Sequence, residues 1–482
     1  MSSVVQELEP KVIWNNFHEI TQIPRPSTKE QRAREWVLAK AKRKGLEIFQ
    51  DKVGNIVICK PASKGRENAP TVVLQGHLDM VCEKNETVPH DFDKDPIRVV
   101  RKGDWLYADG TTLGADNGVG VASALAVMES DDIKHGPLEF VFTIDEETGL
   151  TGAAGFPGGV LKAKYFLNLD GEEKGTLCIG CSGGVNTTAR RKVALRPAKA
   201  NTAYRVKVSG LKGGHSGVDI HLGRGNAIRV LGGVVQRLID KLNVEVADLK
   251  GGSARNVIPR EASAVVLLDS AKEKELKQIV AQFEAETRTD LGSFDPEVQI
   301  ASEKTERPAQ VLDAKDAQSV VGLLVAIPHG VLAMSPDVPG LVQNSTNLAT
   351  VSVNGDQVEV GSSQRSAIES SKMAAAQMVA TACRLAGFEV EHAGSYPGWK
   401  PEPQSEIVQK CKEVFKEVFG SETRLVAMHA GLECGVIGEK YPGMQLISFG
   451  PQIESPHSPN ERVEIASVGE FWKYLKAVLE RL

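Results

Sequence analysis

A histidine and an aspartate, His77 and Asp79, directly follow an apolar stretch at residues 71–74 that is typical of a strand. A lone His-x-Asp pair is common in proteins and indicates little by itself. Here, however, acidic residues and one late histidine recur after similar stretches, or in loops rich in Gly, Pro and Asn. Such loops are where the polar side chains of an open α/β sheet converge. The pattern therefore predicts a metal site.

Five of these positions can form a site for two metal ions: His77, Asp116, Glu147, Asp170 and His457. Imidazole and carboxylate ligands without a thiolate suit Zn²⁺, Mn²⁺ or Co²⁺, whereas Ca²⁺ prefers oxygen ligands only. Three carboxylates against two divalent ions leave about one positive charge, which lowers the pKa of a bound water toward roughly 7. We therefore expect two divalent ions, in the first place Zn²⁺, with a bridging hydroxide as the nucleophile.

Glu146 is the expected general base of this site. Adjacent glutamates at a strand end point in different directions, so Glu146 can face the attacking water if Glu147 binds metal. Glu146 would then pass the proton to the leaving amine. An acidic triplet is usually a solvated turn, but residues 145–147 follow the apolar run FVFTI, which favours a role in a site. Asp79 is expected to support His77 or the base rather than to bind metal.

The order of predicted elements divides the chain into two domains. Residues 1–186 alternate strands and helices, and residues 398–482 return to helix, strand and amphipathic helix. This alternation predicts a discontinuous α/β domain whose mixed sheet is flanked by helices. Residues 187–397 show period-two strands paired with amphipathic helices, which predicts an inserted α+β domain built of two weakly related halves.

Two short motifs have structural interpretations. Ser27 and Glu30 have the spacing of a capping box for a helix that ends near Gly45. Cys178 and Cys181 form a Cys-x-x-Cys pair. That pair lacks the second ligand pair of a zinc knuckle and the strand-to-helix turn of a thioredoxin site. We interpret both cysteines as small residues of a strand.

The composition argues against several classes of partner. The chain has 57 basic and 62 acidic residues, so neither nucleic acid nor an anionic membrane is an expected partner. Residues 1–14 lack a basic segment followed by an apolar core, and no uncharged apolar run reaches about 18 residues. Seven cysteines, an odd number, favour reduced thiols. We therefore expect a soluble, cytoplasmic protein that acts on a small molecule.

Taken together, the motifs resemble one family over almost the whole chain. This is the cocatalytic zinc aminopeptidase and acylase group, which includes glutamate-type carboxypeptidases, succinyl-diaminopimelate desuccinylase and carnosinase. The matching segments are IPRPS, VGNIVICKPA, LQGHLDMV, TTLGADNGVG, LEFVFTIDEETGLTGA, GGHSG, RNVIP, HAGLECG and GPQIESPHSPNERV. The resemblance implies a dinuclear metallopeptidase that hydrolyses dipeptides with a free N-terminus, including those that end in histidine. The inserted domain would be its lid or dimerisation domain.

The resemblance also implies how the ligands divide between the two ions. Asp116 would bridge both. His77 and Asp170 would bind one ion, and Glu147 and His457 the other. Glu146 again matches the general base, and Asp79 the residue that orients the base or His77.

Candidate substrate-binding residues come from the inserted domain and from the HAGLECG motif. His215 matches a lid histidine that stabilises the oxyanion, which in some members comes from a partner subunit of a homodimer. Asn256 and Arg365 match lid residues that hold substrate. Arg365 would bind the terminal carboxylate, although a surface arginine that caps a helix is an alternative. His429 and Glu433, four residues apart, would share one helical face and contact substrate or support the ligands.

Two other functions stay open at this point. The same ions could serve an acylase or a tripeptidase, because the motifs do not show which amide fits beneath the lid. A protein that binds peptides without cleaving them is the alternative from a different class. That alternative predicts a disrupted ligand set, and the set in this sequence is intact.

Overall fold

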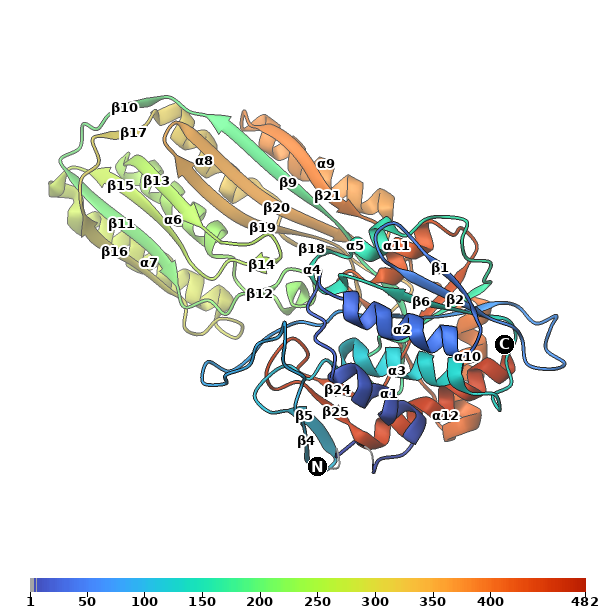
Figure 1. Cartoon of the computed structure of the whole chain (residues 1–482). Helices are drawn as coiled ribbons and strands as arrows, with labels where there is room; N and C mark the ends of the chain where they lie inside the picture. Colours follow the sequence, from blue (N-terminus) through green and yellow to red (C-terminus); the bar gives the residue numbers. More distant parts are fainter. Residues whose placement is uncertain (1–3, 6) are drawn as a thin grey trace. The chain divides into compact units, whose positions relative to one another are not determined.

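The structure, a computed structural model that describes residues 4, 5 and 7–482, divides into two compact units (Figure 1). Unit 1 comprises Met1–Gly180, Trp399–Ala427 and Leu432–Leu482, and unit 2 comprises Cys181–Gly398 and Met428–Gly431. The sequence places residues 428–431 in the first domain. They belong to unit 2 because the Ser182 N–H lies 3.0 Å from the carbonyl oxygens of both Met428 and Ala430. The expected absence of a targeting segment concerns residues 1–14, of which residues 1–3 and 6 lie outside the described residues.

In the described part of unit 1, the central element is an eight-stranded mixed sheet in the order β1-β2-β6-β3-β7-β23-β8-β22. Its strands are β1 (Glu47–Gln50), β2 (Ile56–Lys60), β3 (Val72–His77), β6 (Leu138–Thr143), β7 (Tyr165–Asn168), β8 (Thr176–Cys181), β22 (Arg424–Met428) and β23 (Gln445–Ser448). Strands β6, β3, β7 and β23 run parallel, whereas β1 and β2 are antiparallel additions. Every residue of β3, β6 and β7 is buried, so both faces of the sheet are covered.

The helices of unit 1 cover this sheet. They are α1 (Lys11–Thr21), α2 (Gln31–Arg43), α3 (Ala115–Glu129), α4 (Glu146–Gly149), α5 (Thr151–Gly155), α10 (Glu406–Phe419), α11 (Glu433–Glu439) and α12 (Ile465–Arg481). Helix α3 packs against β3 and α1, and its residues 115–128 are all buried, which only its small side chains allow. The predicted mixed sheet flanked by helices is confirmed, and Cys178 and Cys181 lie in β8 as expected.

The capping box predicted at Ser27 and Glu30 is wrong. Ser27 Oγ donates to Asp79 Oδ2 (2.7 Å) instead of capping α2. Glu30 Oε1 accepts the N–H groups of Thr28 (2.8 Å) and Asp145 (3.1 Å). The distant contacts of Ser27 with Asp79 and of Glu30 with Asp145 therefore replace the local capping pattern, and both side chains bind segments close to the candidate site.

A small four-stranded sheet connects the C-terminal part of unit 1 to its N-terminal part. Its strands, in the order β24-β25-β5-β4, are β24 (Ile453–Glu454), β25 (Arg462–Glu464), β5 (Trp105–Ala108) and β4 (Val99–Lys102). Strand β25 pairs with β5 through Val463 and Leu106. The loop between β24 and β25 carries His457.

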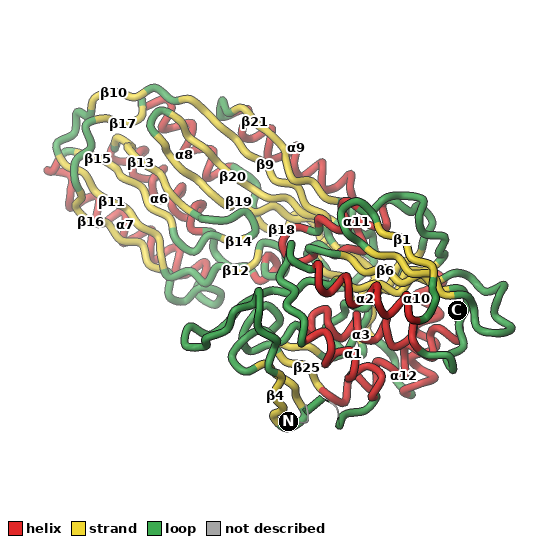
Figure 2. Tube along the Cα trace, in the orientation of Figure 1, coloured by secondary structure: helices red, strands yellow, loops and turns green. Residues whose placement is uncertain are grey.

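Unit 2 is an antiparallel sheet with helices along one side (Figure 2). Its main strands are β9 (Gly183–Lys192), β11 (Thr202–Ser209), β13 (Glu245–Gly251), β15 (Ala262–Leu268), β16 (Gln299–Thr305), β18 (Gly330–Met334), β19 (Val342–Asn354), β20 (Gln357–Ser366) and β21 (Glu389–Tyr396). Two short pairs accompany them: β10 (Leu195–Pro197) with β17 (Gln310–Leu312), and β12 (Gly214–His215) with β14 (Val257–Ile258). The helices are α6 (Ala227–Leu242), α7 (Glu273–Leu291), α8 (Ala314–Ala326) and α9 (Glu369–Leu385).

Alternating burial along β11 shows which face of this sheet is packed. Val206 and Val208 are buried in the core formed with the helices, whereas Arg205 and Lys207 are exposed. Such alternation is typical of an antiparallel sheet with one face in solvent. The predicted inserted α+β domain is confirmed.

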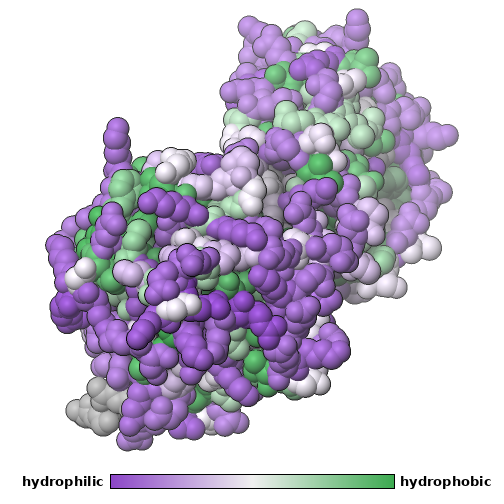
Figure 3. Space-filling model, turned by 90° about the vertical axis from the view of Figure 1, so that its right-hand side faces the viewer, coloured by the Kyte–Doolittle hydropathy of each residue, from purple (hydrophilic) through white to green (hydrophobic). Residues whose placement is uncertain are grey.

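The surface carries mostly polar side chains. On the face shown in Figure 3, hydrophilic residues predominate and hydrophobic ones form small patches. Within the described residues, no helix combines the length and apolar character needed to cross a membrane.

The close packing of α3 against the sheet can be tested at Gly120. A Cβ at this position would lie 2.3 Å from the Leu169 carbonyl oxygen, which is backbone and cannot move aside easily. We expect Gly120→Ala to lower the free energy of unfolding, because overpacking costs about 1–3 kcal/mol. This cost equals or exceeds the gain of about 1 kcal/mol in helix propensity that alanine brings.

Gly469 in α12 of the same unit provides the matched control, because a Cβ there would meet no atom within 4 Å. Gly469→Ala should leave stability unchanged or increase it. Urea unfolding of both variants measures the difference. Equal stability of the two variants would contradict the packing described for α3.

Candidate functional site

Three parallel strands of unit 1 end at the same edge of the sheet, and candidate ligands follow each of them. His77 is the last residue of β3, Glu146 and Glu147 begin α4 after β6, and Asp170 follows β7. The carboxyl ends of parallel strands are the usual position of binding residues in α/β sheets. This topology explains why residues far apart in the sequence converge here.

Asp116 lies between the two candidate histidines. It stands in the first turn of α3 with a non-helical backbone (φ −80°, ψ 113°). Its Oδ1 lies 3.0 Å from His77 Nε2, and its Oδ2 lies 3.2 Å from His457 Nε2. His457 comes from the β24–β25 loop and has φ +60°. One carboxylate thus faces both imidazoles, which is the geometry that the predicted bridging role requires.

The five predicted ligands form two groups of three that share Asp116. The first group is His77, Asp116 and Asp170, and the second is Asp116, Glu147 and His457; in each, the ligand atoms lie within 4.8 Å of one another. His77 Nε2 is 3.5 Å from Asp170 Oδ1, and His457 Nε2 is 3.0 Å from Glu147 Oε2. The structure therefore brings all five together in the pairing that the family resemblance implies.

Two carboxylate oxygens of this cluster indicate that the residues fit metal ions. In the described structure, the buried atoms Asp170 Oδ1 and Glu147 Oε1 accept no hydrogen bond. Burying a carboxylate oxygen without a hydrogen bond is costly, and a divalent ion in each group would stabilise these two oxygens. Two imidazoles with three carboxylates suit Zn²⁺, Mn²⁺ or Co²⁺.

Asp79 fixes both the His77 ring and the segment that carries the two glutamates. Its Oδ1 lies 3.2 Å from His77 Nδ1 and accepts the Glu146 N–H at 3.1 Å. Its Oδ2 accepts the Glu147 N–H at 3.1 Å and the Ser27 hydroxyl at 2.7 Å. Burial alone would raise the pKa of Asp79, but hydrogen bonds, first of all with His77, hold it well below its usual range. An ionised Asp79 thereby directs His77 Nε2 toward Asp116.

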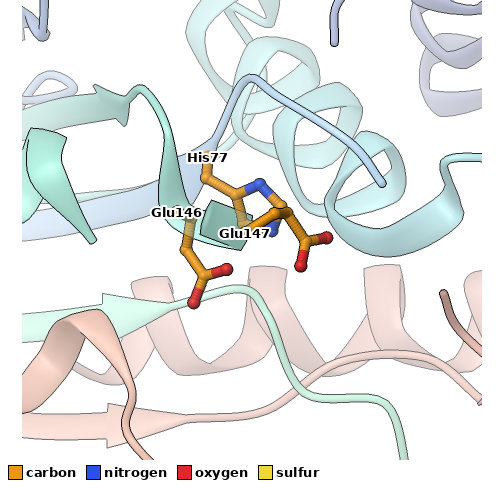
Figure 4. Close-up of side chains that lie close together, drawn as sticks. All are labelled: His77, Glu146 and Glu147. Atoms are coloured by element: carbon orange, nitrogen blue, oxygen red, sulfur yellow. The ribbon is translucent and has the colours of Figure 1, made fainter. Parts of the chain in front are cut away.

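Glu146 has the environment of a proton acceptor. Figure 4 shows Glu146 and Glu147 on the turn after β6 with their carboxylates pointing apart, and a carboxylate oxygen of each lies within 4.8 Å of a His77 ring nitrogen. Burial raises the pKa of Glu146 well above its ordinary value, and the carboxylates of Asp170 and Glu433 add to this, while His77 opposes it. A glutamate with a raised pKa is suited to accept a proton near neutral pH.

The prediction that His429 and Glu433 share a helical face is wrong. Helix α11 begins only at Glu433, and His429 precedes it in the segment that belongs to unit 2. Glu433 is buried in unit 1, where its Oε2 accepts hydrogen bonds from Thr143 Oγ1 (2.7 Å) and Gln75 Nε2 (2.5 Å). Burial raises the pKa of Glu433 to about 7. Glu433 thus connects β3 and β6 near the ends that carry the site residues.

Unit 2 gathers the remaining candidates into a second cluster. His215 in β12 pairs with Val257 in β14, next to Asn256, whose carbonyl accepts the N–H of Ser216 (2.8 Å). The Arg365 guanidinium lies 3.4 Å from the Ser216 hydroxyl.

Arg365 is a buried residue of β20, so the alternative of a surface arginine that caps a helix is wrong. Its Nη1 donates to Tyr396 Oη at 2.8 Å. His429 Nε2 lies 2.7 Å from the Oγ of Ser345, which pairs with Arg365 across β19 and β20. The cluster is therefore positively charged and rich in hydrogen-bond donors.

Three ionisable residues near the unit 1 site are not identified by sequence reasoning. Arg25 and Glu461 are buried, and Glu172 follows Asp170 by two positions. Burial, together with Asp116 and Asp170, raises the pKa of Glu172 to about 8. Glu461 occurs four residues after His457 in PHSPNE, and Arg25 within IPRPS, so both motifs contained a signal.

With this fold and geometry described, comparison with known proteins identifies the class. Residues 73–481 match Peptidase family M20/M25/M40. The chain belongs to this family and is an enzyme of the peptidase class, which confirms the resemblance predicted from the motifs.

Individual relatives narrow the comparison. The chain is 39% identical over 481 residues to the cytosol non-specific dipeptidase of Escherichia coli (strain K12), covering 100% of this chain and 99% of that protein. The crystal structure of aminoacylhistidine dipeptidase from Vibrio alginolyticus superposes with a TM-score of 0.92 at 40% identity, covering 99% and 98% of the two chains. Aminopeptidase PepT from Bacillus cereus shares the fold, with a TM-score of 0.58 at 18% identity. Within the family, the chain is therefore similar over nearly its full length to two proteins that are named as dipeptidases.

Metal binding at this site should release protons, so affinity should rise with pH. Hydrogen bonds to Asp116 and Glu147 raise the pKa of His457 to about 11 in the metal-free protein. Burial lowers the pKa of His77, but Asp170 and Asp116 raise it well above its usual value. His457 therefore carries a proton near neutral pH, and the pKa of His77 is shifted in the same direction, so each ring must lose a more tightly held proton to bind metal.

Calorimetric titration of metal-free protein with Zn²⁺ or Mn²⁺, in two buffers of different ionisation enthalpy, measures this proton release. We expect close to two ions per chain and weaker binding as the pH falls. An affinity independent of pH would contradict the protonation of the histidines. A stoichiometry of one ion would contradict the two-group site.

Proposed function

We propose that the chain is a metal-dependent dipeptidase that hydrolyses dipeptides with a free N-terminus, including those with a C-terminal histidine. The observation that carries the proposal is Asp116, whose two oxygens face His77 and His457 in two groups of three candidate ligands. The names of the two relatives that match nearly the full chain support the choice of dipeptides.

The residues of unit 1 would divide the chemical step between them. When bound, two divalent ions, in the first place Zn²⁺ with Mn²⁺ or Co²⁺ as alternatives, would polarise the scissile carbonyl and acidify the attacking water. Glu146 accepts the proton of that water and delivers it to the leaving amine. Asp79 keeps His77 in one orientation and holds the backbone of Glu146 and Glu147 in place.

His215 is proposed to stabilise the oxyanion. Its Nδ1 accepts the N–H groups of Gly217 (3.3 Å) and Val218 (3.1 Å), so the proton of the neutral ring is on Nε2. Burial and the neighbouring Arg365 lower the pKa of His215, which keeps the ring neutral near pH 7. Nε2–H is then a donor suited to a developing oxyanion.

Arg365, Asn256 and His429 are proposed to bind the substrate. The buried Arg365 guanidinium provides donors for the terminal carboxylate of a dipeptide. Burial and Arg365 lower the pKa of His429 to about 3, so this residue is a neutral neighbour of the cation. We also propose a homodimer through unit 2, in which these groups act on their own chain or on that of the partner.

The rival functions have less support. An acylase or tripeptidase would use the same ligands, but the tripeptidase structure from Staphylococcus aureus is only 17% identical to this chain, against 40% for the aminoacylhistidine dipeptidase. A protein that only binds peptides would not need five ligands in two groups around one shared carboxylate. We further propose a cytosolic location, as in the name of the Escherichia coli relative.

Replacement of the proposed base separates catalysis from metal binding. Glu146→Gln keeps the side-chain volume but removes the proton acceptor, so kcat should fall by about 10²–10⁴-fold. Metal content should stay near that of the wild type, because Glu146 is outside both groups that share Asp116. Turnover with a defined dipeptide and metal analysis of the same sample measure both quantities.

The matched control is Glu139→Gln, a buried glutamate of β6 outside the site that accepts the Lys162 N–H. This variant should retain wild-type kcat. Hydrolysis by Glu146→Gln at a rate close to wild type would show that another residue is the base.

Substrate length and the free amine distinguish the dipeptidase from its same-class rivals. A dipeptide with a free amine should be cleaved. For an N-acetylated amino acid with the same first residue, and for a tripeptide one residue longer, kcat/KM should be at least about 100-fold lower. Chromatographic rate measurements with all three compounds decide the question. Preferred cleavage of the N-acetylated compound would indicate an acylase, and preferred cleavage of the tripeptide a tripeptidase.

A further inference from the structure

A single buried carboxylate binds four consecutive backbone amides beside the candidate site. Glu461 is 2% exposed. Its Oε2 accepts the N–H groups of Leu113 (2.6 Å) and Gly114 (2.9 Å). Its Oε1 accepts those of Ala115 (2.7 Å) and Asp116 (3.2 Å). Hydrogen bonds from backbone N–H groups to an ionised carboxylate are among the strong ones in proteins, so this segment has little freedom.

Glu461 also belongs to the loop that carries His457. It follows His457 by four residues, and its own N–H donates to the Ser458 carbonyl at 3.0 Å. The main chain of Glu461 is thus part of the loop that carries His457, and its side chain binds the segment that carries Asp116. Asp116 and His457 are 341 positions apart in the sequence, and Glu461 connects the backbones that carry them.

Arg25 makes the corresponding connection to β3. This buried guanidinium donates through Nη1 to the carbonyls of Leu78 (3.0 Å) and Asp79 (2.5 Å), and through Nη2 to that of Gly114 (2.6 Å). A Cβ on Gly114, whose φ is +68°, would lie 2.5 Å from Nη2. Arg25 therefore joins the end of the strand that carries His77 to the segment that leads into Asp116.

Neither Arg25 nor Glu461 belongs to the two groups of candidate ligands. Together, however, they bind the segments that carry three of the ligands, which are His77, Asp116 and His457. The segment 113–116 is bound both by the anion Glu461 and by the cation Arg25. Asp116 faces both His77 and His457, and groups that bind metal must be held within about 0.5 Å of their productive geometry, which requires a rigid support.

We propose that Glu461 and Arg25 are positioning residues that hold Asp116 between His77 and His457, and that Glu461 sets the affinity and geometry of the ion shared by Asp116, Glu147 and His457. This inference rests on the proposed metal centre but not on the proposed dipeptide substrate. Residues that orient metal ligands from behind typically account for 10–100-fold in metal affinity.

Glu461→Gln tests the proposal in the full-length protein. The side-chain NH₂ of the glutamine is only a donor, so it cannot accept the two backbone N–H hydrogen bonds that one oxygen of Glu461 accepts in the wild type. Calorimetric titration of metal-free protein with Zn²⁺ should show about 10–100-fold weaker binding of one of the two ions. The absorption spectrum of the Co²⁺-loaded protein should change as well, because it reports ligand geometry.

Glu139→Gln is the matched control. Glu139 is 4% exposed, and both of its carboxylate oxygens accept the Lys162 N–H (3.0 and 3.1 Å), at the end of β6 remote from Glu146. Loss of this buried carboxylate should lower stability without changing Zn²⁺ affinity or the Co²⁺ spectrum. If both variants weakened Zn²⁺ binding equally, the effect of Glu461 would be purely structural and the proposal would be wrong.

Arg25→Lys keeps the inference testable if Glu461→Gln does not fold. Lysine retains the charge but cannot hold three carbonyls in the geometry of the guanidinium, so weaker Zn²⁺ binding and an altered Co²⁺ spectrum are expected. Wild-type affinity and spectrum in whichever of the two variants folds would overturn the proposal. A wild-type protein that bound no metal would instead refute the proposed function, which keeps the two failures distinct.

Discussion

The repulsion among carboxylates buried at one edge of the unit 1 sheet is the constraint on which the rest of the structure depends. Each charge needs donors or cations, and the structure supplies them in two ways. Asp79 and Glu461 are surrounded by backbone N–H and side-chain donors, whereas Asp170 and Glu147 keep buried oxygens that accept no hydrogen bond in the described structure. This difference separates supporting carboxylates from candidate ligands.

Unit 2 has the opposite electrostatic character at its own cluster. The cation Arg365 lies beside two histidines whose pKa values are lowered by burial and by that cation. The cluster thus provides neutral or positive donors, which suit a negatively charged group such as a carboxylate or an oxyanion. The site residues of unit 1 are mainly hydrogen-bond acceptors, whereas those of unit 2 are mainly donors. The two kinds of group thus come from the two domains into which the chain divides.

Much of the fold and of the candidate site could be predicted because the decisive patterns are local. The apolar runs before His77, Asp145–Glu147 and Asp170 can be recognised as strands from the sequence alone. The family motifs indicated which ligands pair with which. Predictions failed where a distant contact competes with a local pattern. Ser27 has a capping position but donates to Asp79, and the helix after His429 begins four residues later than its spacing indicates.

Residues that act only through long-range contacts could not be predicted in the same way. Arg25 and Glu461 lie in motifs that mark them as residues of interest, but their contacts join segments separated by 89 and 348 positions, so the motifs do not show what the two side chains bind. The roles of the site residues themselves stay predictions, because proximity shows what can cooperate and not what does.

The late position of His457 has a consequence for the biosynthesis of the protein. Four of the five candidate ligands lie within residues 77–170, but the group of Asp116, Glu147 and His457 needs the β24–β25 loop, close to the C-terminus. During translation, that group cannot assemble until nearly the whole chain has left the ribosome. A nascent chain that has not yet reached residue 457 therefore lacks the second group of candidate ligands.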